Sequence, residues 1–181
     1  MSLSVQVIDT ASELFESVIQ LRRRYLGTNP AREDDFDRRE ALRDASSYHL
    51  IYLDTDEIVG TLRVTPLGHG LSFVERAVDV RRYFQHPTDA FDANRLVLDE
   101  RYRGGKHLRM FLLQAAIWLK ANTHLRFISA LCRGQLAALY VGLGGRVLMD
   151  DVTWAGEQAE RCYSLVYLEL EIVYNNVNGA N

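Results

Sequence analysis

One stretch near the middle of the 181-residue chain reads Leu96-Val97-Leu98-Asp99-Glu100-Arg101-Tyr102-Arg103-Gly104-Gly105-Lys106-His107. Its apolar first part belongs to a strand that we expect over residues 92–99, and an almost continuous apolar helix, which should be buried, is expected over 107–121. Main-chain N–H groups point outward at such a turn, and the helix dipole favours negative charge there. The stretch therefore predicts an anion site suited to phosphate, with a solvated surface connection as the alternative.

Before this stretch, the patterning predicts a strand (3–8), a helix opened by a capping box (10–26), a short surface helix within 27–47, and a hairpin (48–53 and 58–64). Residues 66–91 are too long for a simple connection, and we expect an inserted flap with an amphipathic helical stretch at 73–84. After it, we expect a strand (125–132), a helix (135–143) ended by Gly144 and Gly145, two strands (146–154 and 163–171) and a flexible tail (175–181).

This order of elements predicts a single-domain α/β fold over residues 1–174, in which a mixed, mostly antiparallel central sheet carries helices on both faces. The 21 basic and 24 acidic side chains, a net charge of −3, argue against a nucleic-acid or membrane-surface protein. No apolar run approaches the roughly 20 residues that cross a bilayer, and no secretion signal is visible, so we expect a cytoplasmic protein. Two cysteines exclude a cysteine-based metal site, and the five histidines show no metal spacing.

The stretch at 96–105 resembles the GNAT acyltransferase superfamily, in which a strand ending in an acidic-aromatic-Arg-Gly turn leads into a helix that binds the pyrophosphate of acyl-CoA. A second match, Ala138-Leu139-Tyr140-Val141-Gly142-Leu143-Gly144-Gly145-Arg146, is similar to the family's late helix. The resemblance covers most of the chain and implies an N-acyltransferase. It implies donor binding by main-chain groups of the strand and by the turn, at Leu96, Val97, Leu98, Arg101, Arg103, Gly104, Gly105, Lys106 and His107.

The sequence departs from the family at Lys106 and Leu108, where the family has small residues. Side chains there hinder close approach of a diphosphate, whereas Gly104 and Gly105 can take positive φ and admit a ligand to the main chain. The departure is compatible with acyl carrier protein as donor, whose phosphopantetheine arm carries one phosphate. The branch with autoinducer synthases and N-acyl amino acid synthases uses such donors, but no tryptophan precedes Trp118, which disfavours autoinducer synthesis.

The implied reaction is attack of a primary amine on a thioester, with a main-chain N–H as oxyanion donor. Tyr140 is the expected acid for the leaving thiolate, with a core tyrosine as the alternative. The first candidate base is Asp92, and the second is Glu75. Arg63 and Arg95 could bind an acceptor carboxylate. The alternative for these two arginines is a structural salt bridge to Asp92 or to the acidic cluster at 34–37. We expect Cys132 to be an inert thiol.

We therefore expect transfer of an acyl group from acyl-CoA or acyl carrier protein to a small-molecule amine such as an amino acid, by a monomer or homodimer that needs no metal. One alternative is an acyl-homoserine lactone synthase that uses S-adenosylmethionine. The other is a non-catalytic domain that senses acyl-CoA or binds a partner.

Overall fold

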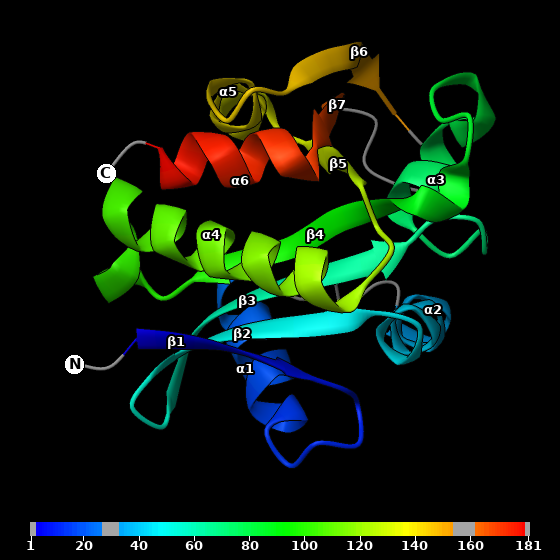
Figure 1. Cartoon of the computed structure of the whole chain (residues 1–181). Coiled ribbons are helices and arrows are strands. Elements are labelled where there is room, and N and C mark those ends of the chain that lie inside the picture. Colours follow the sequence, from blue (N-terminus) through cyan, green and yellow to red (C-terminus); the bar gives the residue numbers. More distant parts are fainter. Residues whose placement is uncertain (1–2, 27–32, 154–161, 180–181) are drawn as a thin grey trace. The chain divides into compact units, whose positions relative to one another are not determined.

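The computed structural model describes residues 3–26, 33–153 and 162–179, and its strands and helices are interspersed along the chain (Figure 1). The strands are β1 (Leu3–Ile8), β2 (Tyr48–Asp54), β3 (Glu57–Pro66), β4 (Ala90–Leu98), β5 (Phe127–Cys132), β6 (Arg146–Val152) and β7 (Tyr163–Glu169). The helices are α1 (Phe15–Leu26), α2 (Glu33–Ala45), α3 (Phe73–Ala77), α4 (Gly105–Asn122), α5 (Gly134–Gly142) and α6 (Leu170–Asn178). The expected hairpin is confirmed as β2 and β3, which pair antiparallel.

The strand order is β1-β2-β3-β4-β5-β7-β6. Strands β1 and β2, β5 and β7, and β6 and β7 also pair antiparallel, whereas β4 and β5 pair in parallel through Ala90–Asp92 and Phe127–Ser129. The mixed, mostly antiparallel sheet is thus confirmed. Two compact units divide the chain within β4: the first comprises Met1–Thr65 and Ala93–Ala115, and the second Pro66–Asp92 and Ala116–Asn181.

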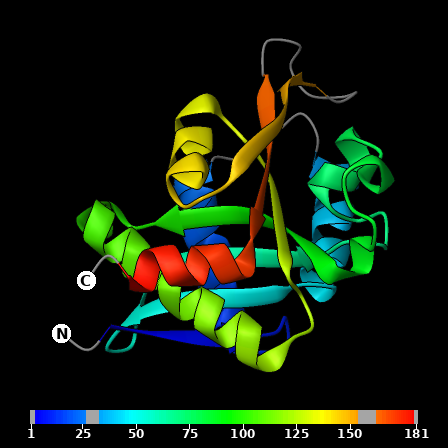
Figure 2. The ribbon, with the colours of Figure 1, turned by 45° about the horizontal axis from the view of Figure 1, so that its top comes forward.

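In the first unit, the alternation of β2 brings helices to both faces of the sheet. Ile51 belongs to a buried cluster with Val18 of α1, whereas the neighbouring Tyr52 stacks on Phe111 of α4 at 5.1 Å between ring centroids. Successive strand side chains point to opposite faces, so α1 and α4 cover opposite sides of β2. Figures 1 and 2 show β1, β2 and β3 side by side with α1 on one face.

In the second unit, apolar residues of the flap pack with residues of β6 and β7 in a buried cluster: Leu67, Val74, Val80, Phe84, Ala90, Val152 and Leu165. Helix α5 ends before Gly144, whose φ is 94°, and a Cβ on Gly144 would lie 2.4 Å from Ile172 Cγ2 of α6. The expected stop at this glycine is therefore required both by the backbone and by the close approach of α6.

Several expected boundaries differ from the structure. Helix α1 begins only at Phe15, because residues 10–14 form turns in which the Ser12 carbonyl accepts from the Phe15 N–H. The flap helix α3 has five residues, and the extended residue Val78 ends it. The sequence does not predict α6, which forms because Leu170 and Val173 are buried and which includes residues 175–178 of the expected tail.

Helix α4 is not buried all around. Phe111 and Leu119 are buried, but Met110 is 37% exposed and Ile117 is 47% exposed. These two residues are seven positions apart and share one face of the helix, so the expected burial holds for the opposite face only.

Candidate active site

The turn between β4 and α4 is built around Asp99, which is 5% exposed. Its Oδ1 accepts from the Arg101 main-chain N–H at 3.1 Å and caps a 3-10 turn at Glu100–Tyr102. Helix α4 then starts, and its first backbone bond runs from the Leu108 N–H to the Gly104 carbonyl. The N–H groups before Leu108 have no intrahelical acceptor, as in the first turn of any α-helix.

Gly104 and Gly105 leave this helix start open. A Cβ on either glycine would meet nothing within 4 Å. Neither glycine takes the positive φ that the sequence allows. The glycines with positive φ in the described chain are Gly68, Gly70 and Gly144. The turn needs no left-handed residue, since the Asp99 cap makes it.

Two of the expected phosphate ligands, Arg101 and Arg103, are exposed and also have partners within the protein. The Arg101 Nε donates to Asp99 Oδ1 at 2.8 Å, which lowers the pKa of Asp99 to about 2, and its other nitrogens reach Glu57 on β3. The Arg103 Nε donates to the Leu98 carbonyl at 3.2 Å, and its guanidinium lies 4.5 Å from the centre of the Tyr25 ring.

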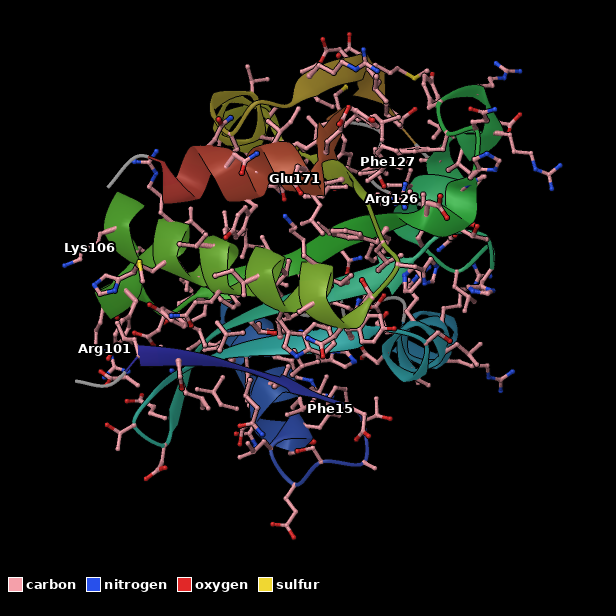
Figure 3. The ribbon with its side chains drawn as sticks, viewed as in Figure 1. Phe15, Arg101, Lys106, Arg126, Phe127 and Glu171 are labelled. Carbon is pink, nitrogen blue, oxygen red and sulfur yellow. The ribbon has the colours of Figure 1, made fainter. Side chains whose placement is uncertain are left out.

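Lys106 and Arg109 are exposed on the first turns of α4. Figure 3 shows the Lys106 side chain extending away from the ribbon at the start of the helix. His107 is half-buried, with its ring edge-on to Tyr102. Arg101 and Arg103 are exposed as well, so four cations face solvent around the helix start, and two of them also hold the turn.

Tyr25 of α1 also holds this turn, a contact that the sequence does not reveal. Its hydroxyl donates to Asp99 Oδ2 at 3.0 Å and accepts from the Glu100 N–H at 3.3 Å. The residue lies 74 positions before Asp99, and no spacing within the sequence pairs the two.

Strand β4 is irregular immediately before the turn. Arg95 has a φ of 53°, in the left-handed region that a non-glycine residue seldom takes. Ala90–Ala93, Val97 and Leu98 are buried, but Asn94, Arg95 and Leu96 are only half-buried. The middle of an inner strand is therefore more exposed than both of its ends.

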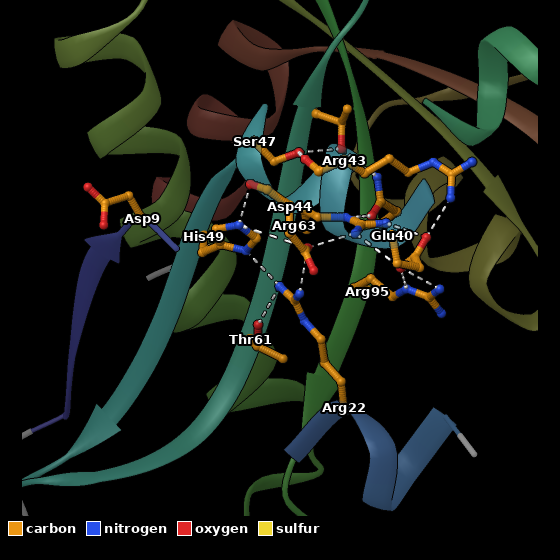
Figure 4. Close-up of polar contacts among 12 residues, drawn as sticks. Asp9, Arg22, Glu40, Arg43, Asp44, Ser47, His49, Thr61, Arg63 and Arg95 are labelled. Atoms are coloured by element: carbon orange, nitrogen blue, oxygen red, sulfur yellow. Dashed lines mark hydrogen bonds and ion pairs between the residues drawn. The ribbon is translucent and has the colours of Figure 1, made fainter. Parts of the chain in front are cut away.

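A buried ionic network in the first unit joins α1, α2, β2, β3 and β4 (Figure 4). It consists of Arg22, Glu40, Arg43, Asp44, His49, Thr61, Arg63, Asn94 and Arg95. Asp44 Oδ1 accepts from Arg22 at 3.1 Å and from Arg63 at 2.7 Å. Glu40 accepts from Arg43, Arg63 and Arg95, at 2.6, 3.1 and 2.8 Å.

The surface helix expected within 27–47 is α2, and the network adds that one of its faces is buried. Helix α2 carries Arg43, which is 2% exposed, and Asp44, which is 7% exposed. Arg63 pairs with Glu40 and Asp44, and Arg95 pairs with Glu40, whereas the side chains of the acidic cluster at 34–37 lie outside the described part of the chain. The one sequence signal was the four-residue spacing of Glu40 and Asp44, which places both on one helix face.

The electrostatics of the network follow from burial and from its charges. Burial alone would raise the pKa of Glu40, but the guanidiniums of Arg63 and Arg95 outweigh it and lower the pKa to about 2. Burial lowers the pKa of His49 to about 4, so this histidine is neutral at pH 7. Its Nδ1 then accepts from Arg22 at 2.9 Å, and its Nε2 donates to the Asp44 carbonyl at 2.9 Å.

Acidification from pH 6.5 to pH 4 is expected to destabilise the fold by about 3 kcal/mol through His49, because the unfolded chain binds a proton near pH 6.5 that the folded chain refuses. Above pH 6.5 both states are neutral at His49, and it adds no slope. Glu40 adds a further loss as the pH falls from about 4.5 towards 2. Denaturant unfolding at pH 7, 5.5 and 4 measures the slope. His49→Gln should flatten it, whereas the exposed control His124→Gln should not; equal slopes in both variants would contradict the assignment.

In the second unit, Tyr140 of α5 is 7% exposed. Burial, with smaller contributions from Cys132 and Asp92, raises the pKa of its phenol far above the usual 10. Burial also raises the pKa of Cys132 to about 11, and its thiol donates to the Ser164 carbonyl at 3.7 Å. The phenol therefore stays protonated at neutral pH and can act as a proton donor, and the thiol is a poor nucleophile.

The two candidate bases hold the flap. Asp92 is fully buried, and its Oδ2 accepts from the Phe73 N–H, the first residue of α3, at 2.9 Å. The Glu75 carboxylate accepts from the N–H groups of Gly68, Gly70 and Ser72, at 2.7, 3.0 and 3.2 Å. These three main-chain donors fix the position of the Glu75 carboxylate, which is the geometry of a structural carboxylate.

Within the described ranges, no group of three or more His, Cys, Asp or Glu side chains could hold a metal ion. None of the helices described there is long and apolar enough to cross a membrane.

No family model matches the sequence, and no curated protein matches it significantly. Solved structures do match. An acetyltransferase of the GNAT family from Streptococcus pneumoniae is 18% identical with a TM-score of 0.55 and covers 93% of this chain and 99% of its own. An acyl-CoA N-acyltransferase from Pseudomonas aeruginosa is 15% identical, with a TM-score of 0.63 and coverage of 91% and 99%.

The chain therefore has the fold of the GNAT acyltransferases. MesI, a CoA-dependent acyl-homoserine lactone synthase, is 16% identical, with a TM-score of 0.65 and coverage of 98% of this chain and 94% of its own. At these identities the likeness establishes the fold, and the activity has to be argued from the site.

Proposed function

We propose that this protein is an N-acyltransferase that moves an acyl group from acyl-CoA or acyl carrier protein to a primary amine of a small molecule. The observation that carries the proposal is the half-buried, left-handed interruption of β4 at Arg95, which directly precedes the turn and the open start of α4. Strained backbone of this kind concentrates at functional sites. Its position supports a role for the main chain that follows it.

The proposed donor site follows the chain from Leu96 to His107. Main-chain groups of Leu96, Val97 and Leu98 would bind the two amides of the pantetheine arm. The N–H groups of Gly105, Lys106 and His107 would bind phosphate, with Lys106 adding a positive charge. Arg101 and Arg103 keep the turn in shape through Asp99 and Leu98 and are proposed to act on the donor only through it.

In the proposed reaction, the neutral amine nitrogen bonds to the thioester carbonyl carbon, and the carbonyl oxygen becomes an oxyanion held by a β4 main-chain N–H. The C–S bond then breaks. Tyr140 gives its proton to the leaving thiolate, and the phenolate recovers one from the amine, so no net proton is consumed. Asp92 and Glu75 are assigned no proton transfer because both hold the flap. Arg63 and Arg95 are assigned to no acceptor because Glu40 binds both.

A second candidate is acyl-homoserine lactone synthesis. It is favoured by the structural match to MesI, which extends over nearly the whole chain. It would use S-adenosylmethionine as the amine. Incubation with S-adenosylmethionine and an acyl donor, followed by detection of the lactone, separates this activity from simple amide formation.

The test of the donor site is thiol release and donor affinity in Gly105→Ala. A Cβ there meets nothing in the protein, so stability should be equal or higher, but the methyl group should hinder the phosphate and weaken donor binding about ten-fold. Gly134→Ala is the matched control, because Gly134 is also the first residue of a helix and its Cβ also meets nothing.

The assay compares acetyl-CoA, long-chain acyl-CoA and acyl carrier protein, each with a set of primary amines. Equal donor affinity in the two glycine variants would contradict the site. Tight donor binding with no thiol release for any pair would favour a sensing domain over an enzyme.

A further inference from the structure

Arg95 stands out among the residues with left-handed backbone. Thr55 lies in the hairpin turn between β2 and β3, and Asp151 lies in β6 at an irregular part of its pairing with β7, whereas Arg95 lies in the middle of β4. The left-handed conformation is unfavourable for a residue with a Cβ. Surrounding contacts must therefore stabilise it.

Those contacts act on two consecutive side chains. Asn94 Oδ1 accepts from Arg63 Nε at 2.6 Å, and Asn94 Nδ2 donates to Thr65 Oγ1 at 3.2 Å. The next residue, Arg95, donates to Glu40 Oε2 at 2.8 and 3.1 Å, and Arg63 also binds Glu40. In a regular strand these neighbours would point to opposite faces, but here both join the same network. The left-handed backbone is thus a bulge.

Glu40 is well placed to hold this bulge. Its side chain is 15% exposed, it lies on α2, and Arg43 and Arg63 fix its carboxylate independently of Arg95. Removing the Arg95 side chain therefore leaves Glu40 paired with two guanidiniums, and removing the Glu40 charge releases Arg95 from this ion pair. The two variants separate the side chain of Arg95 from the backbone that it holds.

We propose that Glu40 is a positioning residue: its ion pair with Arg95 keeps β4 bulged at residue 95 and so directs the main-chain groups of Leu96, Val97 and Leu98 towards the acyl donor. The inference rests on the proposed acyl transfer, whose donor arm those main-chain groups would bind. Glu40 acts on the reaction only through the backbone of β4.

The experiment compares Arg95→Ala, Arg95→Gly and Arg95→Asn. Alanine must bear the left-handed conformation without the ion pair, whereas glycine and asparagine adopt it readily. We expect kcat to fall about ten-fold in Arg95→Ala and to stay within about three-fold of the wild type in the other two, with the KM of the amine unchanged in all three.

Glu40→Gln should lower kcat by a similar factor in the wild type and have little effect in the Arg95→Gly background. Glu171→Gln, which breaks an exposed pair with Lys120, is the control.

Equal activity in the alanine and glycine variants overturns the inference, whether both are unaffected or both are impaired. Equal impairment with a raised KM for the amine would instead assign the Arg95 guanidinium to the acceptor. The backbone can also be followed without activity, by thermal unfolding and by hydrogen exchange of the Leu96–Leu98 amides. Arg95→Ala should unfold at a lower temperature and exchange faster than Arg95→Gly. These readouts test the bulge even if the wild type releases no thiol. Absence of thiol release would contradict the proposed function but not the role of Glu40 in holding the bulge.

Discussion

Tyr140→Phe is expected to lower kcat about 100-fold or more, because positioned general acids contribute about 10²–10⁴-fold and the variant removes the hydroxyl group while keeping the ring. Burial raises the pKa of the phenol, so it is protonated throughout the neutral range and holds the proton that the leaving thiolate would take, and the same shift makes it a weaker acid than a free phenol. Donor affinity and the unfolding temperature should change little.

The measurement is steady-state thiol release with the most active donor and amine. Tyr167→Phe is the matched control, since it removes a phenol on β7 that contacts the exposed Glu169 at 3.5 Å. If Tyr140→Phe keeps the kcat of the wild type, the residue is a core tyrosine and another group protonates the thiolate. An equal loss in both variants would point to damage of the fold.

The second large effect is on stability, in Asp44→Ala. This carboxylate separates the guanidiniums of Arg22 and Arg63, which are 6% and 0% exposed, and it binds both. Burial lowers the pKa of Arg22 to about 10 even though the Asp44 carboxylate acts to raise it, so the buried position disfavours the charged guanidinium. Without Asp44, two buried cations face each other, and we expect a loss of about 3–5 kcal/mol in unfolding free energy.

Denaturant unfolding at pH 7 measures this loss. Glu171→Ala is the control, because it breaks an ion pair whose carboxylate is largely exposed and should change the stability little. Asp44→Asn keeps the shape and one oxygen acceptor and should lose less than Asp44→Ala. Should Asp44→Ala be as stable as Glu171→Ala, the network would not contribute to folding in the way its burial suggests.

The regular parts of the fold were predictable because their signals are local. The hairpin at β2 and β3 follows from two apolar runs separated by four polar residues, and the start of α5 and its stop at Gly144 follow from an apolar helix followed by glycine. Where signals were weak, the expectations were wrong in detail. The amphipathic stretch at 73–84 forms only a short helix, because the Ser72 and Glu75 capping box starts it and the extended Val78 ends it.

The candidate site was predictable only as a position in the chain. The acidic-aromatic-Arg-Gly motif locates the turn between β4 and α4, but it does not reveal that Arg101 and Arg103 have partners within the protein. These partners include Glu57, which lies 44 residues before Arg101, and Tyr25, which lies 78 residues before Arg103. Charge alone could not show which of the basic residues have partners within the protein.

By itself, the sequence determined the order of the strands and helices before α6, the α/β class and the position of the turn between β4 and α4, because hydrophobic periodicity and glycine placement act over a few residues. Only the tertiary structure decided which charges are buried together. Glu40 and Arg95 are 55 residues apart, and their pairing, with the left-handed backbone that goes with it, exists only once α2 and β4 meet. Ion pairs of this kind depend on burial and distance in space, which no local pattern contains.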